Sequence, residues 1–453
     1  MNHLLINFKR FILVLGDILI MFFTLWLALL LRHGADYSAL LWQTHWQIFG
    51  LLYLVWLPIY YAFNLYDLRA NLFVVPLITN LIKSNLVNTV IAIIYFYLIS
   101  PNVLLTPKTI LAINIFLATI LIFCWRRLFI SLIRNQVLEN NLVFIGWDPL
   151  IKEIIKEAPA LGYQPKAVFN AHEEIRENYN IHLYNNLENL SEIIKQEKIH
   201  LAILAHPLSE KVASELFQTL KLRINFMSLT HFYEKVFQRI PLPIINQGWF
   251  LENLSEGNKT LFERIKRLFD IILALSLGLL ALPFIPFISF SIALDSKGPI
   301  FFSQIRTGRD GKIFKAIKFR TMYKNSEEKG PTWAKENDPR ITKIGRFLRN
   351  IRIDEIPQLW NIFIGEMSFV GPRPERPEFV SQLEQSIPFY RERLLVKPGL
   401  TGWAQINLPY ASSIDETLKK LQYDLYYIKN RNFFLDLGII LKTLNTILKG
   451  GGR

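Results

Sequence analysis

The first 130 residues contain four long apolar runs, whose lengths predict membrane-spanning helices. These runs cover residues 11–31, 46–65, 86–100 and 109–125, and each approaches the ~20 residues that cross a bilayer. Since the first run is long enough to stay in the membrane, no cleavable signal peptide is expected. Asp17 lies inside this run, where a carboxylate is costly in lipid, so it is expected to face a neighbouring helix.

Positive charge predicts the orientation of these spans, because cytoplasmic loops carry an excess of Lys and Arg. Residues 33–44 and 101–107 carry almost none and are expected outside. The cytoplasmic side is then expected to hold Lys9, Arg10, Arg69, Lys83, Arg126, Arg127 and Arg134. Four spans with this loop pattern place both ends in the cytoplasm.

From about 141 to 240 the pattern changes to short apolar runs that alternate with amphipathic stretches, which predicts a Rossmann-like α/β module. Strands are expected at 142–146, 166–169 and 200–205, and helices at 149–157 and 188–197. The turn after the first strand reads GWDPL, where a dinucleotide site would have the glycines of G-x-G-x-x-G. The module is therefore expected to be structural or regulatory, and whether it binds a ligand is left open.

The apolar run 268–294 is long enough to span a membrane, but it is predicted to enter the bilayer and return. Pro283 and Pro286 lie mid-run, where each removes a helix hydrogen bond at a cost of roughly 3 kcal/mol. Basic residues flank both ends, and between 259 and 350 eighteen Lys and Arg outnumber eight Asp and Glu, which opposes crossing. The alternative is a fifth, kinked span.

After this run the pattern predicts a smaller α+β region. Residues 299–302 and 315–319 are expected to pair as a hairpin around the turn at 309–311. Helices are expected at 359–363, 381–393 and 417–448. The apolar face of the last is expected to pack on the core, and the alternative is that it lies on the bilayer.

Composition agrees with a membrane protein that handles an acidic ligand. The chain is 51% hydrophobic and 13% aromatic, which is too apolar for an ordinary soluble enzyme. A net charge of +14 indicates contact with lipid headgroups or nucleotide phosphates, and no nucleic-acid motif is present. One cysteine, Cys124, excludes a disulfide within the chain.

Asp354 and Glu355 are adjacent acids in a stretch rich in arginine. Their neighbours along the chain are Arg340, Arg346, Arg349, Arg352, Arg373 and Arg376. A chance pair on a solvated helix is one interpretation. The other is phosphoryl chemistry on a nucleotide, in which one carboxylate holds a divalent metal, the other attacks phosphorus, and guanidinium groups neutralise the phosphates.

Five strings between about 260 and 450 resemble, in order, those of the bacterial sugar transferase family, the polyprenyl-phosphate hexose-1-phosphate transferases. They are residues 318–322 (KFRTM), 338–342 (DPRIT), 354–360 (DEIPQLW), 371–374 (GPRP) and 397–405 (KPGLTGWAQ). The resemblance implies transfer of a sugar-1-phosphate from a UDP-sugar to undecaprenyl phosphate with release of UMP. This would be the first membrane step of exopolysaccharide or O-antigen assembly.

The resemblance also implies an architecture in the bacterial inner membrane. The hydrophobic pattern assigns four transmembrane helices to 1–135 and the Rossmann-like module to 136–250, and the resemblance adds a monotopic α+β catalytic domain at 251–453, with a re-entrant helix at about 265–294. The catalytic domain would face the cytoplasm. A homodimer through the Rossmann-like module is one arrangement, and the oligomeric state is left open.

The resemblance assigns roles to residues of the strings. Asp354 would attack the β-phosphorus and form a phosphosugar–aspartyl enzyme, which needs no general base because a carboxylate is already ionised at neutral pH. Glu355, beside Asp354, would bind Mg²⁺ or Mn²⁺, since hard oxygen ligands suit these ions. Substrate-binding roles fall to Lys318, Arg320, Arg349, Arg373 and, near the base, Trp403.

Strings at 330–334, 376–379 and 421–426 resemble the exopolysaccharide branch of the family. They favour UDP-glucose or UDP-galactose over acetamido sugars, while the sugar and the polysaccharide pathway are left open.

Two other classes of protein were weighed against this interpretation. A membrane-anchored nucleotide-sugar 4,6-dehydratase needs an intact glycine fingerprint and a Tyr-x-x-x-Lys pair, and no tyrosine here has a lysine four positions on. A non-catalytic assembly scaffold would be expected to lose the acids and arginines, which this chain keeps.

Overall fold

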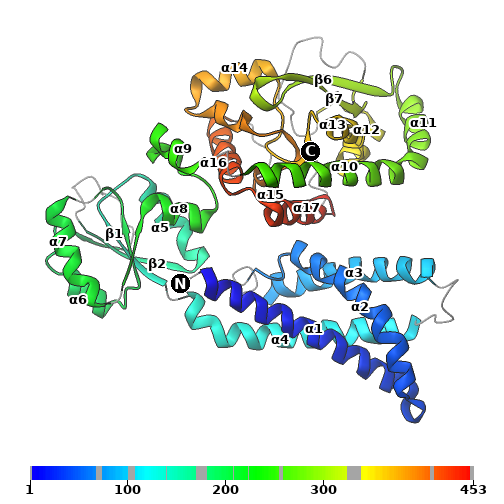
Figure 1. Ribbon diagram of the computed structural model, residues 1–453, viewed down its shortest axis with the longest axis horizontal. Helices are drawn as coiled ribbons and strands as arrows, with labels where there is room; N and C mark the ends of the chain where they lie inside the picture. Colours follow the sequence, from blue (N-terminus) through cyan, green and yellow to red (C-terminus); the bar gives the residue numbers. More distant parts are fainter. Residues whose placement is uncertain are drawn as a thin grey trace. The chain divides into compact units, whose positions relative to one another are not determined.

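The computed structural model describes residues 3–67, 74–99, 108–138, 140–169, 181–207, 209–222, 224–254, 259–323, 338–408 and 413–448 (Figure 1). The chain divides into two compact units, Met1–Leu229 and Thr230–Arg453. The loop at 101–107, Arg69 and the string at 330–334 lie outside the described residues.

Four helices open the first unit, as the hydrophobic pattern predicts, but the third begins at Val74 and not near residue 86. Lys83, expected on the cytoplasmic side, therefore lies inside this helix and inside its candidate span. The four helices are α1 (His3–His33), α2 (Ala39–Ala62), α3 (Val74–Ile99) and α4 (Lys108–Leu138). Helix α1 packs against α2 and α4, and α3 also packs against α2 and α4. Within the described residues, Phe8–Asp36, Val74–Tyr97, Lys108–Leu132 and Thr260–Asp295 are long and apolar enough to cross a membrane. The second predicted span forms helix α2, but its many Trp, Tyr, Gln and His residues keep it out of this set.

A buried ion pair joins the first and last of these helices. Asp17 on α1 pairs with Arg126 on α4, and both side chains are almost fully buried. Arg126 also donates to the carbonyl of Leu65 and lies 5.0 Å from the ring centre of Tyr66. The prediction that Asp17 faces a neighbouring helix is confirmed, since a charge in apolar surroundings needs a partner.

A parallel sheet follows, with strand order β3-β2-β1-β4-β5. Its strands are β1 (Asn140–Ile145), β2 (Tyr163–Phe169), β3 (His182–Tyr184), β4 (Leu201–Leu204) and β5 (Asn225–Ser228). Helix α5 (Leu150–Glu157) lies on one side, and α6 (Leu190–Gln196) and α7 (Glu210–Gln218) lie on the other (Figure 1). The predicted strands and helices of this module are confirmed, with small shifts at their ends.

The turn after β1 is held by one of its own side chains and by His206, which follows β4. The carboxylate of Asp148 accepts a hydrogen bond from the backbone N–H of Leu150, at 2.9 Å. The His206 ring lies 2.7 Å from the carbonyl oxygen of Trp147. The Asp148 carboxylate thus engages a backbone N–H in the place where a dinucleotide fingerprint would present free N–H groups.

The second unit combines helices with short strands. In chain order its elements are α8 (Leu229–Phe237), α9 (Gln247–Asn253), α10 (Thr260–Ala281), α11 (Ile285–Asp295), β6 (Phe301–Thr307), β7 (Ile313–Phe319), α12 (Lys343–Asn350), α13 (Gln358–Ile364), β8 (Ser368–Val370), α14 (Pro377–Ser386), β9 (Gly399–Thr401), α15 (Trp403–Asn407), α16 (Ile414–Asn430) and α17 (Phe433–Leu448). The predicted hairpin is confirmed as the antiparallel pair β6–β7.

Two predicted helices differ in their limits. Helix α14 starts at Pro377, because proline suits the first turn, and ends at Ser386 before a 3₁₀ helix at Tyr390–Leu395. The predicted helix 417–448 is two helices, since the chain leaves helical geometry at Arg431. Leu421, Leu425 and Ile428 of α16 are buried in the core of the unit, as expected.

Residues 230–250 pack with the second unit, although the pattern groups them with the α/β module. The N–H of Ile240 donates to the carbonyl of Gln422 at 3.0 Å. The indole N–H of Trp403 donates to the carbonyl of Gln238 at 2.9 Å. The domain limits at 135 and 250 stay a prediction.

Helices α10 and α11 form a bent apolar pair (Figure 1). A single 3₁₀ turn, Leu282–Phe284, separates them, with Pro283 inside it and Pro286 in the first turn of α11. Arg267 of α10 donates to the carbonyls of Ile362 and Phe363, both at 2.6 Å. At the far end, Asp295 accepts a hydrogen bond from the N–H of Ile344 at 2.9 Å.

Candidate active site

The two adjacent acids lie on a strained turn. Helix α12 ends at Asn350, and two residues later Arg352 has a φ of 55°, in the left-handed region that residues with a side chain seldom adopt. The chain then makes a 3₁₀ turn, Ile353–Glu355, in which Asp354 and Glu355 are each 7% exposed. Backbone strain of this kind persists where the surroundings hold it, and it occurs often at functional sites.

Glu355 is surrounded by cations. Its Oε1 lies 2.7 Å from Lys318 Nζ and 3.1 Å from an Nη of Arg373, and its Oε2 lies 3.8 Å from Arg352. Burial by itself would raise the pKa of Glu355, but these three positive charges hold it well below its usual range. Glu355 is therefore a fixed carboxylate across the whole physiological range of pH.

Asp354 is in the opposite state. Within the described residues its carboxylate has no hydrogen bond or ion pair with a protein group. Burial raises the pKa of Asp354, Lys318 opposes this, and the charge of Glu355 adds to it. Burial also lowers the pKa of Lys318, against the effect of Glu355. The result is one carboxylate locked by cations beside another that can react.

Arg349 is a further cation whose charge acts on Asp354. Its Nε donates to Thr321 Oγ1 at 2.8 Å, which holds α12 to the chain just after β7. Burial lowers the pKa of Arg349, and the charge of Asp354 is the largest effect that opposes this. Lys318, Arg349, Arg352 and Arg373 thus surround the two acids, and this excess of positive charge suits a diphosphate.

Asn361 fixes the strand that carries Lys318, and the sequence analysis gave it no role. Its side-chain oxygen accepts from the N–H of Ile317 at 3.1 Å, and its amide donates to the carbonyl of Lys315 at 2.8 Å. The side chain, 1% exposed, therefore joins α13 to β7 at one residue from Lys318. The sequence feature that could have pointed to Asn361 is a polar residue between two apolar ones, in 360–362 (WNI), because a buried polar side chain needs hydrogen-bond partners.

The loop that carries Arg373 starts from two strands in close contact. Strands β8 and β9 pair in parallel, and the N–H of Gly399 donates to the carbonyl of Pro372 at 2.9 Å. A Cβ on Gly371 would lie 2.3 Å from the carbonyl oxygen of Lys397, so no side chain fits. The glycines of GPRP and KPGLTG are thus explained by this approach of two backbones, which the sequence alone did not show.

Arg320 and Trp403, both predicted to bind substrate, make other contacts. Arg320 donates to the carbonyls of Ser296 at 2.5 Å and Ile292 at 3.3 Å, at the end of α11. Trp403, 6% exposed, stacks on Tyr426 with ring centres 5.8 Å apart. In the described part of the chain, neither side chain has a contact with Asp354 or Glu355, and their roles in binding stay predictions.

The donor set at the two acids fits Mg²⁺ or Mn²⁺. The described residues contain no group of three or more His, Cys, Asp or Glu placed to hold a metal. Magnesium is commonly held by one or two carboxylates, with substrate phosphates and water completing its six ligands. The oxygens of Asp354 and Oε2 of Glu355 provide this kind of hard oxygen donor.

Comparisons with known proteins find similarity to one family of enzymes. The family described as Bacterial sugar transferase matches residues 261–450. A UDP-glucose:undecaprenyl-phosphate glucose-1-phosphate transferase of Escherichia coli (strain K12) is 32% identical over 326 residues, 69% of this chain and 68% of that protein. A UDP-N-acetylgalactosamine-undecaprenyl-phosphate N-acetylgalactosaminephosphotransferase of Aeromonas hydrophila is 44% identical over 188 residues, 42% of this chain and 44% of the relative. A UDP-galactose-lipid carrier transferase of Erwinia amylovora is 36% identical over 203 residues, 42% of this chain and 41% of the relative.

These matches span less than half the length of the Aeromonas and Erwinia relatives. They favour neither the dehydratase nor the scaffold alternative. Together with the candidate spans, they indicate a membrane protein.

Proposed function

The chain belongs to the bacterial sugar transferase family, and from this premise we propose that it transfers a sugar-1-phosphate from a UDP-sugar to undecaprenyl phosphate and releases UMP. The observation that carries the proposal is the pair of neighbouring acids in opposite states. Glu355 is locked by Lys318 and Arg373, while Asp354 has no hydrogen bond or ion pair with a protein group among the described residues. A single buried turn thus offers a nucleophile and a cationic cradle for phosphates.

The chemistry consists of two displacements at phosphorus. First, an oxygen of Asp354 attacks the β-phosphorus of the UDP-sugar, an O–P bond forms, and the bond to the α-phosphate oxygen breaks, so that UMP leaves. Lys318, Arg349 and Arg373 neutralise the charge that moves onto UMP. Second, an oxygen of undecaprenyl phosphate attacks the same phosphorus and frees the Asp354 carboxylate. Neither step needs a proton to be removed from the nucleophile.

Mg²⁺ or Mn²⁺ would be held by Glu355 and Asp354, and when bound it withdraws charge from the diphosphate. The residues of the chain supply the attacking oxygen and align the diphosphate. Asp354 supplies the attacking oxygen, and the cations around Glu355 keep the diphosphate in line.

The membrane arrangement is part of the proposal. We infer that α10 and α11 enter the inner membrane and return to the cytoplasmic face. Both ends of this pair are attached to the same compact unit, through Arg267 and through Asp295, which supports a return. Leu279, Phe287 and Phe290 are 70%, 73% and 66% exposed, as expected of side chains that face lipid.

The module between the spans and the catalytic unit is Rossmann-like in this proposal. Its strand order, β3-β2-β1-β4-β5, is that of the first five strands of a doubly wound sheet. A homodimer through this module stays a prediction.

The proposed activity is tested by UMP release. Purified protein is incubated with undecaprenyl phosphate, Mg²⁺ and, in separate reactions, UDP-glucose, UDP-galactose and the two UDP-N-acetylhexosamines. UMP is expected with at least one sugar, and Asp354→Asn is expected to abolish it. Glu378→Gln is the matched control, because this side chain is 55% exposed on α14 and is expected to keep activity. UMP release by Asp354→Asn would remove the nucleophile assignment.

Orientation is tested separately by labelling. A Glu384→Cys, Cys124→Ser variant places one thiol on the exposed face of α14. A membrane-impermeant maleimide is expected to label it in inside-out vesicles and not in intact spheroplasts. Labelling in intact spheroplasts would place the catalytic unit outside and contradict the proposed return of α10 and α11.

A further inference from the structure

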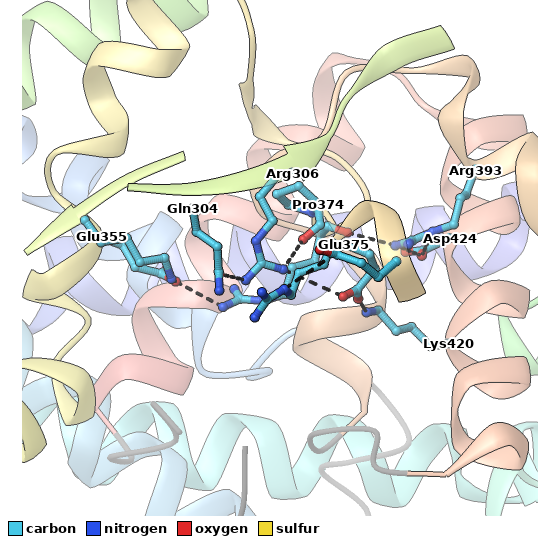
Figure 2. A network of polar contacts seen from close by, with 12 residues as sticks. Gln304, Arg306, Glu355, Pro374, Glu375, Arg393, Lys420 and Asp424 are labelled. Atoms are coloured by element: carbon cyan, nitrogen blue, oxygen red, sulfur yellow. Dashed lines mark hydrogen bonds and ion pairs between the residues drawn. The ribbon is translucent and has the colours of Figure 1, made fainter. Parts of the chain in front are cut away.

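Two arginines donate hydrogen bonds to backbone carbonyls of the loop 372–374 (Figure 2). Arg393 donates to the carbonyl oxygen of Arg373 at 2.9 Å. Arg306, on β6, donates to the carbonyl oxygen of Pro374 at 3.0 Å. Both contacts fall on the short segment whose central side chain, Arg373, reaches Glu355 at 3.1 Å.

Arg393 is itself fixed by buried partners. Two of its nitrogens lie 2.9 Å and 3.2 Å from one carboxylate oxygen of Asp424 on α16, and both side chains are 2% exposed. A third nitrogen donates to Tyr390 Oη at 3.0 Å. One guanidinium group therefore joins the 3₁₀ helix Tyr390–Leu395, α16 and the loop, and its planar fork leaves little freedom of orientation.

Glu375 secures the other end of the loop (Figure 2). Its carboxylate pairs with Lys420 of α16 and lies 3.9 Å from Arg306. Burial would raise the pKa of Glu375, but Lys420, Arg393 and Arg306 bring it down to about 2. Glu375 is thus ionised at neutral pH, and it keeps the loop attached to α16.

The backbone of the loop 372–374 has little conformational freedom. Pro372 and Pro374 have fixed φ angles, so the remaining freedom of the segment lies mainly at Arg373. A hydrogen bond to the carbonyl of Arg373 restrains its ψ, and with it the direction of the side chain. Removing that bond would free the ψ angle of Arg373 and let its guanidinium group swing away from Glu355.

We propose that Arg393, held by Asp424, is a positioning residue for Arg373. It acts through the backbone carbonyl and does not reach the substrate. This inference rests on the proposed function in one respect, because the diphosphate is the ligand that Arg373 is positioned to meet. A net stabilising role is a weaker explanation, since buried ion pairs add little stability compared with apolar residues of the same shape.

A double-mutant cycle tests the proposal. Arg393→Lys keeps the charge but loses the fork, and we measure kcat/KM for UMP release with and without Arg373→Ala. With Arg373 present, a loss of about tenfold or more is expected, because a misplacement of about 1 Å can cost about 100-fold. With Arg373→Ala, the same change is expected to cost less than about twofold, since the group to be positioned is gone. An equal loss in both backgrounds would overturn the proposal.

Arg431→Lys is the matched control. Arg431 is also a buried arginine that pairs with a carboxylate, Glu263 at 3.0 Å, and donates to a backbone carbonyl, that of Ile428 at 2.7 Å. Its effect on kcat/KM is expected to be the same factor with Arg373 and with Arg373→Ala. If Arg431→Lys showed the same dependence on Arg373 as Arg393→Lys, the specific role of Arg393 would be contradicted.

A milder variant and a second readout keep the test decisive. If Arg393→Lys does not fold, Tyr390→Phe removes one hydrogen bond from Arg393 and takes its place in the cycle, with a smaller loss that again depends on Arg373. The affinity for UDP, measured by calorimetry, gives a readout without turnover. If UMP release is absent from the unmodified protein, the proposed function fails. The positioning role is then judged by whether Arg393→Lys weakens UDP binding only when Arg373 is present.

Discussion

Exchanging each of the two adjacent acids for its amide is expected to affect stability differently, with a clear loss for Glu355→Gln and none for Asp354→Asn. Asp354 and Glu355 are both 7% exposed and are neighbours on one 3₁₀ turn. Glu355→Gln removes the charge that pairs with Lys318 and Arg373, and leaves these cations facing one another. Asp354→Asn removes a charge that burial disfavours and that no cation contacts directly among the described residues.

The size of the loss follows from the contacts of Glu355. Two charge-assisted hydrogen bonds, at 2.7 Å and 3.1 Å, weaken when the carboxylate becomes an amide. Because Lys318 and Arg373 are 21% and 29% exposed, part of their charge is screened by water. At about 1.5–3 kcal/mol for each such bond, partly kept by the amide oxygen, we expect a loss of about 3 kcal/mol. In a domain of about 200 residues this lowers Tm by roughly 6–12 °C.

The dependence on pH gives the sign of each effect. The pKa of Glu355 lies below its ordinary value in the folded state, so its stabilisation is present above that ordinary value and is lost as pH falls through the folded pKa. The pKa of Asp354 lies above its ordinary value, so its ionised form costs stability at neutral pH, and Asp354→Asn is expected to leave Tm unchanged or slightly higher.

Thermal unfolding of the purified protein in detergent, followed between pH 5 and 8, measures both variants against the unmodified chain. Both are expected to lose UMP release, so activity does not separate them and stability does. An equal fall of Tm in the two variants, or a larger fall for Asp354→Asn, would refute the assignment of opposite states to the two acids.

Three further outcomes are expected. In a pH series of UMP release, the acid limb of the kcat/KM profile should lie above the ordinary pKa of an aspartate. The reason is that burial raises the pKa of Asp354 and only its ionised form attacks. An acid limb at the ordinary value would contradict this. Asn361→Leu leaves two backbone groups of β7 without partners and should lower the free energy of unfolding by about 2–4 kcal/mol. Thermal unfolding measures this loss, with Asn407→Leu, at an exposed turn of α15, as the control. Gly371→Ala would place a Cβ 2.3 Å from the carbonyl oxygen of Lys397, so the protein should be recovered poorly folded by size-exclusion chromatography, whereas Gly278→Ala, with open space around it, should behave as the unmodified chain.

Local sequence was sufficient wherever one periodicity dominated. Apolar length predicted the four N-terminal helices, and the alternation after residue 141 predicted the parallel α/β module, because burial of one face or of a whole run imposes its period on the chain. The break at Pro283 and Pro286 was predicted for the same kind of reason, since proline removes a hydrogen bond wherever it stands in a helix. The limits of α14 and α16 were less well predicted, because helix ends depend on the groups that cap them.

The sequence predicted only part of the candidate active site. The sequence by itself determined that two acids and several arginines lie close along the chain, and it singled out Asp354, Glu355, Lys318 and Arg373. Only the tertiary structure decided that Glu355 is locked by cations from two other segments while Asp354 is not, because β7 and the loop after β8 are 37 and 18 residues away along the chain. The same holds for Asn361, whose partners lie on another element. The physical reason is that the charge state of a buried carboxylate is set by the groups around it in space, and no local pattern carries that information.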